Sequence, residues 1–169
     1  MQTSTKLYSL EYSDLKTYTT AILFVIGNIV LPQLCHLIPQ GGLTWLPIYF
    51  FTLIGAYKYG WRVGLLTATL SPIVNSLLFG MPATDMLPII LFKSIILALT
   101  ASYCAHRYKR VSLLLFCGVI CTYQAIGALG EWAITGSLSR ALQDIKIGTP
   151  GLLLQLFGGW AFVKYIIKK

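Results

Sequence analysis

The chain has 169 residues, of which 56% belong to the apolar set AVILMFWYC and only 11% are charged. A soluble domain carries about 25% charged residues, because its surface must be wetted. The composition therefore excludes a soluble catalytic domain, an intrinsically disordered chain and a disulfide-knotted secreted fold. It predicts a single membrane domain over residues 1–169, with residues 1–17 as an interfacial lead-in rather than a cleaved signal.

Six apolar segments, separated by polar or charged residues, predict an all-α integral membrane protein with six transmembrane helices. In chain order they are Tyr18–Leu37, Leu43–Ala56, Trp61–Phe79, Thr84–Ala105, Val111–Ile134 and Gly151–Ile167. The second segment has only 14 residues, which suits a helix that is tilted, broken or shielded by its neighbours. The segments lack the alternation of apolar and polar residues that is typical of membrane β-strands.

The basic residues predict which ends of these helices face the cytoplasm, because Lys and Arg are retained on that side. Ten of the 13 basic residues lie before the first segment, between the second and third, between the fourth and fifth, or after the sixth. They are Lys6, Lys16, Lys58, Arg62, Arg107, Lys109, Arg110, Lys164, Lys168 and Lys169. The opposite connections hold only Arg140 and Lys146. We therefore expect both termini in the cytoplasm, and we attribute the net charge of +8 to this topology and to anionic lipid, not to nucleic acid.

The sequence contains little that could support catalysis or hold a cofactor. Its cysteines (Cys35, Cys104, Cys117 and Cys121) form no C-x-x-C pair. His36 and His106 are predicted at opposite membrane faces, and the five acidic residues are spread along the chain. No nucleotide-binding motif occurs. An intramembrane hydrolase or transferase would need two close acids or a nucleophile with its base, so we predict no enzymatic activity, no cofactor and no metal.

Lys93 is the most costly residue for a membrane segment, since the fourth segment places it near mid-depth. Two interpretations remain open. The lysine forms an internal ion pair, with Glu131 as the obvious partner, or it binds an anionic ligand that competes for it.

Further polar side chains lie in the halves of the segments predicted to face outward. The candidate ligand-binding residues are Lys93, Glu131, Asn75, Met81, Asp85, Gln124, Gln155, Trp132 and Trp160. They predict an outward-facing pocket between the fourth, fifth and sixth segments, capped by the loops Gly80–Asp85 and Gly148–Pro150. Helix N-termini at this side favour negative charge, so together with Lys93 they predict an anionic ligand, most simply a carboxylate.

Several short motifs give the chain a resemblance to a known family. They are Leu46-Pro47, Tyr59-Gly60-Trp61-Arg62-Val63-Gly64, Ser71-Pro72, Gly80-Met81-Pro82, Leu87-Pro88 and Gly148-Thr149-Pro150-Gly151 with Gln155. In their order and spacing, over about residues 18–167, the chain resembles the substrate-binding S component of an energy-coupling factor (ECF) vitamin transporter.

That resemblance implies a binding subunit in the cytoplasmic membrane of a prokaryote, with no chemistry performed on its substrate. It implies a vitamin-like ligand and separate scaffold and ATPase subunits as partners. A pair of small residues in the first helix, here Thr17 and Ala21, is the implied contact with the scaffold.

A different class of protein remains as the alternative, namely the six-helix membrane scaffolds of the rod-shape (MreD-like) type. Such a scaffold transports nothing and needs neither a lysine inside the membrane nor a polar pocket.

Overall fold

The computed structural model describes residues 7 and 9–167, and over these residues it contains helices and no strand. The predicted all-α class is therefore confirmed for the described part of the chain. Three residues that entered the topology prediction, Lys6, Lys168 and Lys169, lie outside the described residues.

Among the described residues, four helices are long and apolar enough to cross a membrane. They are α1 (Leu15–Cys35), α4 (Trp61–Phe79), α5 (Leu87–Tyr108) and α6 (Leu113–Thr135). These four correspond to the first, third, fourth and fifth predicted segments. The second segment forms a broken helix and the sixth forms a helix that mixes α and π turns, so the four long helices alone do not establish six crossings.

The second predicted segment is broken, as its short length suggested. It begins with a short helix of five residues, α2 (Gly41–Trp45), which ends where Leu46 adopts a left-handed backbone with φ 46°. A 3-10 turn, η1 (Pro47–Tyr49), then leads directly into α3 (Phe50–Tyr59). Eight of the ten residues of α3 are buried by the surrounding helices, so this short helix lies in the interior of the bundle.

The last predicted segment is one helical run made of different turns. It begins with α9 (Thr149–Leu153), where Pro150 occupies the first turn, a position at which its missing N–H is not needed. It continues as two π-helical stretches, η2 (Leu154–Gly159) and η3 (Phe162–Ile166).

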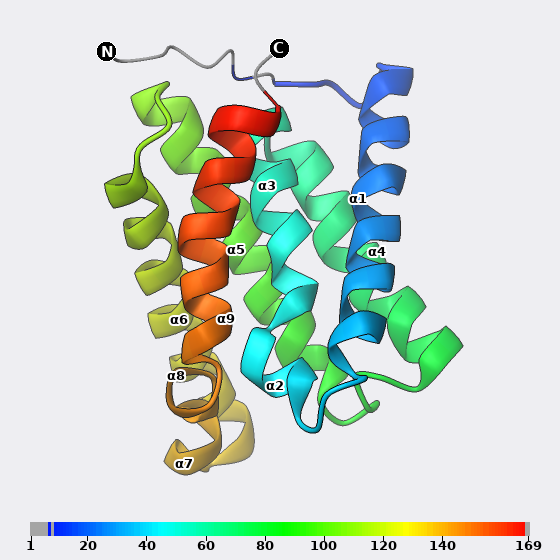
Figure 1. Cartoon of the computed structure of the whole chain (residues 1–169), viewed down its shortest axis with the longest axis vertical. Coiled ribbons are helices and arrows are strands. Elements are labelled where there is room, and N and C mark those ends of the chain that lie inside the picture. The colour runs from blue at the N-terminus through cyan, green and yellow to red at the C-terminus, as the bar shows by residue number, and fades with distance from the viewer. Residues whose placement is uncertain (1–6, 8, 168–169) are drawn as a thin grey trace.

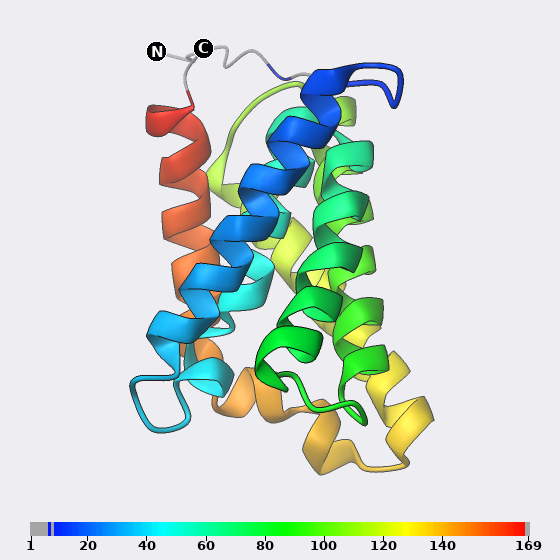
Figure 2. The same ribbon diagram turned by 90° about the vertical axis from the view of Figure 1, so that its right-hand side faces the viewer.

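The helices form an elongated bundle with two distinct ends (Figures 1 and 2). The start of α1 and the end of η3 lie at one end, which we call the terminal end. The opposite end holds α2 and two short helices, α7 (Leu138–Ala141) and α8 (Gln143–Lys146), and we call it the α8 end.

The core and the surface both fit a protein dissolved in lipid. Side chains of α3, α4, α5 and α6 meet in the core, and Leu53, Leu97 and Phe116 are fully buried. Large apolar side chains also point outward, among them Leu77 and Leu114. In water these would be a liability, whereas in a bilayer they match the hydrocarbon around them.

Candidate functional site

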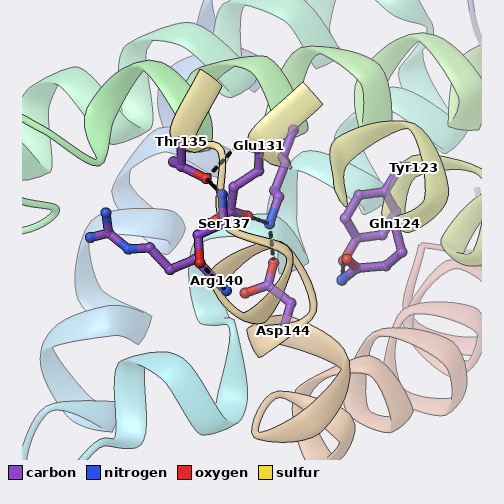
Figure 3. Close-up of polar contacts among 8 residues, drawn as sticks. Tyr123, Gln124, Glu131, Thr135, Ser137, Arg140 and Asp144 are labelled. Carbon is purple, nitrogen blue, oxygen red and sulfur yellow. Dashed lines mark hydrogen bonds and ion pairs between the residues drawn. The ribbon is translucent and has the colours of Figure 1, made fainter. Parts of the chain in front are cut away.

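Lys93 binds two carboxylates inside the bundle, those of Glu131 and Asp144, which are labelled in Figure 3. Its Nζ donates to Glu131 Oε2 of α6 at 2.6 Å and to Asp144 Oδ2 of α8 at 2.7 Å. Lys93 is only 2% exposed. We call these three residues the ion triad. With both acids ionised, the triad carries one net negative charge.

Close approach of α5 to α6 makes the first of these ion pairs possible. A Cβ on Gly127 would lie 2.8 Å from Cγ of Lys93, and one on Gly130 would lie 2.3 Å from Cε1 of Phe92. The absence of both side chains lets the aliphatic stem of Lys93 cross α6 at Gly127. Because Glu131 follows Gly127 by four residues, it lies one turn farther along the same face, where the ammonium ends.

The segment that carries Asp144 is tied to the end of α6 by local hydrogen bonds. Thr135 Oγ1 donates to the carbonyl of Glu131 at 2.7 Å and accepts from the backbone N–H of Ser137 at 3.3 Å. Ser137 then caps α7 by accepting from the backbone N–H of Arg140 at 3.4 Å. The chain thereby turns back toward α5, and α8 brings Asp144 to Lys93 (Figure 3).

The start predicted for the fourth helix differs from the structure. The fourth helix begins at Leu87, not Thr84, so Lys93 is the seventh of its 22 residues. Pro88 in the first turn explains this start, because proline is favoured there and residues 84–86 form a turn outside the helix. Lys93 therefore lies about 9 Å from the α8 end of α5 and about 22 Å from its other end, at 1.5 Å per residue.

A second polar group lies on α6 and the last helix. The hydroxyl of Tyr123 donates to Gln155 Oε1 at 2.8 Å and accepts from Gln124 Nε2 at 3.1 Å. Gln124 is 5% exposed, and its Oε1 has no hydrogen-bond partner among the described residues. The ring of Tyr49 packs against that of Tyr123, with 5.7 Å between the two ring centroids. Gln124 precedes Glu131 by two turns on α6, so this group and the ion triad share one helix.

Asn75 belongs to a third group, between α1, α3 and α4. Its Nδ2 donates to the carbonyls of Asn28 and Ser71, both at 2.9 Å. Asn28 in turn donates to the hydroxyls of Thr52 and Ser71. This network joins helices through buried polar contacts, and no contact described for it reaches the ion triad.

The remaining predicted ligand-binding residues are not gathered with the triad. Met81 and Asp85 are exposed on the loop between α4 and α5, and Trp132 is 49% exposed. Trp160 packs against Lys164, whose Nζ lies 4.5 Å from its ring centroid, toward the terminal end. The predicted coupling residues Thr17 and Ala21 are buried within the chain itself.

The structure shows a cavity of about 880 Å³ at the terminal end, not at the α8 end. Tyr57, Arg62 and His106 are among its lining residues, and none of the predicted ligand-binding residues lines it. At the α8 end the polar groups instead contact one another. Across the part of the chain that the structure describes, no group of three or more His, Cys, Asp or Glu is placed to hold a metal ion.

Sequence reasoning missed three residues that complete these groups: Asp144, Tyr123 and Asn28. Asn28 had a usable signal, since an amide inside an apolar segment needs an interhelical partner. Asp144 had only a weak one, as the sole acid in the connection between the fifth and sixth segments.

The family of the chain follows from a comparison with protein-family models. Residues 16–167 match the model of the ECF transporter, substrate-specific component. No curated protein and no solved structure matches the chain. Because the matched range covers nearly the whole sequence, the chain belongs to this family. It is a multi-pass membrane protein and a transport subunit rather than an enzyme, and the resemblance found in the sequence is confirmed.

Proposed function

We propose that this substrate-specific component captures a vitamin or related micronutrient at the α8 end. It would deliver the molecule together with separate scaffold and ATPase subunits. The observation that carries the location is the buried lysine of the ion triad, about 9 Å into α5. On α6, two turns before Glu131, the amide oxygen of Gln124 is buried and has no hydrogen-bond partner among the described residues. Charged and unsatisfied polar groups are expensive inside a membrane and mark binding sites by default.

We further propose six crossings with the α8 end facing outward in a prokaryotic cytoplasmic membrane. In this arrangement the short helix η1–α3 and the last helix, from α9 to η3, join the four long ones. Seven described basic residues lie at the terminal end, whereas the connections at the α8 end hold only two, Arg140 and Lys146, and Lys93 lies within α5. This division supports a cytoplasmic terminal end.

Cysteine labelling tests this orientation. In a chain whose native cysteines are replaced by serine, a membrane-impermeant maleimide should label Lys146→Cys in intact cells but not Lys109→Cys. Both positions are exposed, so reactivity reports the side of the membrane and not burial. Labelling of position 109 alone would overturn the orientation.

The proposed ligand is an anion, with Lys93, Glu131, Gln124 and Gln155 as its main contacts. Asn75, Met81, Asp85, Trp132 and Trp160 remain proposed contacts that would need the α8 end to rearrange. For the coupling contact with the scaffold we retain Thr17 and Ala21 on α1, which a partner could reach only if α1 shifts, since both are buried.

Native mass spectrometry of gently purified protein is the direct test of this function. We expect one small molecule to be released on denaturation, and the same molecule to raise the melting temperature of the emptied protein. A protein that carries nothing and responds to no vitamin in a thermal-shift panel would contradict binding at the α8 end and favour a scaffolding role.

A further inference from the structure

The two acids of the ion triad are held by the protein in different ways. Glu131 lies within α6, a helix of 23 residues, and its side chain is 9% exposed. Asp144 lies on α8, a helix of four residues between α7 and α9, and its side chain is 13% exposed. Short helices of this kind open at lower cost than a long packed one. Asp144 is therefore the partner of Lys93 that can leave.

Charge balance restricts how an anion could reach Lys93. The triad already holds one net negative charge in a buried place, and a further carboxylate beside it would double that charge within a few ångströms. A carboxylate that takes the place of Asp144 leaves the charge unchanged and restores the hydrogen bond to Nζ. Exchange is thus favoured over addition.

A second buried polar group, the side-chain amide of Gln124, lies on α6 before Glu131. Gln124 precedes Glu131 by seven residues on α6, so the two lie on the same face and about 10 Å apart along the axis. Its Oε1 accepts no hydrogen bond from the described residues, although the side chain is nearly fully buried. Between these polar ends the aliphatic stem of Lys93 covers Gly127, which makes the intervening surface apolar.

We propose that Asp144 occupies the position of the substrate carboxylate on Lys93 and determines specificity by being displaced. The substrate class is then a monocarboxylate with an apolar middle and an N–H or O–H donor at its other end, the donor being bound by Gln124. This inference rests on the proposed binding at the α8 end. In the same inference, segment 136–148 covers the binding site, and the Asp144–Lys93 ion pair holds this segment in place.

The first part of the test needs no ligand. Hydrogen–deuterium exchange of residues 136–148 is compared between the parent, Asp144→Asn and the control Lys146→Gln, all in the same detergent. Lys146 lies on the same short helix but is exposed. We expect exchange to rise several-fold in Asp144→Asn and to stay at the parent rate in Lys146→Gln. An unchanged exchange rate in Asp144→Asn would show that Asp144 does not hold this segment in place, and would overturn that part of the inference.

The second part measures dissociation constants for pantothenate, biotin and lipoate, each beside an analogue in which the carboxylate is an alcohol or amide. For a carboxylate that the parent binds, Asp144→Asn removes the internal competitor, so the affinity should rise roughly ten- to a hundredfold. The uncharged analogue should show no such gain. Asp144→Ser is the second variant if Asp144→Asn does not purify, and the same gain is expected.

Several outcomes would overturn the inference. A weaker affinity for the carboxylate in Asp144→Asn would make Asp144 a direct contact, and tighter binding of thiamine by the parent than by Asp144→Asn would indicate a cationic substrate. If the purified protein releases a small molecule that is not a carboxylate, the substrate class is wrong while the proposed function stands. If it binds nothing, the proposed function fails, and the exchange of residues 136–148 still decides whether Asp144 fastens the segment.

Discussion

Replacing Lys93 with Met removes the only cation of the ion triad while roughly conserving the volume of the side chain. Glu131 and Asp144 then face each other without a counter-charge, in surroundings where their side chains are 9% and 13% exposed. Each carboxylate must then either take up a proton or be hydrated by water that enters the bundle, and both responses cost free energy.

The size of the effect can be worked out from the distances. Opposite unit charges 2.6 Å apart attract by about 6 kcal/mol at an effective dielectric constant of about 20. Desolvation of the three groups offsets part of this attraction, and removal of one partner of a buried ion pair costs about 3–5 kcal/mol in measured cases. We therefore expect Lys93→Met to lower the free energy of unfolding by about 3–5 kcal/mol. Lys93→Met/Glu131→Gln should recover at least half of that loss, because the charge left behind belongs to Asp144, which can turn toward solvent.

The free energy of unfolding is measured in detergent micelles by denaturant titration followed by tryptophan fluorescence. Lys146→Met serves as the control, since this lysine is exposed at the same end, and it should change stability by less than about 0.5 kcal/mol. The reasoning is refuted if Lys93→Met loses less than about 1 kcal/mol. It is refuted equally if the double variant is less stable than the single one, because the carboxylates then do not depend on the lysine.

Two further variants test the packing around the site. Gly127→Ala places a methyl group against the stem of Lys93 and should destabilise by about 1–3 kcal/mol, whereas Gly118→Ala on the same helix meets no atom within 4 Å and should be neutral or slightly stabilising. Equal melting temperatures for these two variants would contradict the close contact. Tyr123→Phe removes the hydroxyl that joins two glutamines and should cost about 1–3 kcal/mol, while the exposed Tyr103→Phe should have little effect. A harmless Tyr123→Phe would mean that the glutamines pair without it.

Helical periodicity in the sequence predicts some of the polar contacts but not others. Gln124 and Glu131 could be placed on one face of the fifth segment, because residues seven apart return to the same side of a helix. Glu131 could also be named as one possible partner of Lys93. The ion pair between them is present, and periodicity could not choose it over a free lysine, because that choice depends on how closely α5 and α6 approach at Gly127.

The contact between Asp144 and Lys93 could not be predicted from helical periodicity. Asp144 lies 13 residues after Glu131, beyond the cap at Ser137 and the four-residue helix α7, and no repeat in the sequence relates it to Lys93. The predicted start of the fourth helix, Thr84, differs from the observed start, Leu87, for a related reason. Helix ends depend on local turns, here the one before Pro88, and they shift by several residues without changing the hydropathy of a segment.

By itself the sequence determined that this chain is dissolved in lipid, which segments are helical, and how the basic residues divide between the two ends. These properties follow from composition and local order, because the bilayer rejects charge and requires each spanning segment to satisfy its own backbone. Only the tertiary structure decided that Lys93 meets both Glu131 and Asp144, and that Gln124 and Gln155 meet at Tyr123. Those contacts depend on the rotation of each helix about its axis and on the path of the segment 136–148, which are set by packing between parts of the chain far apart in sequence.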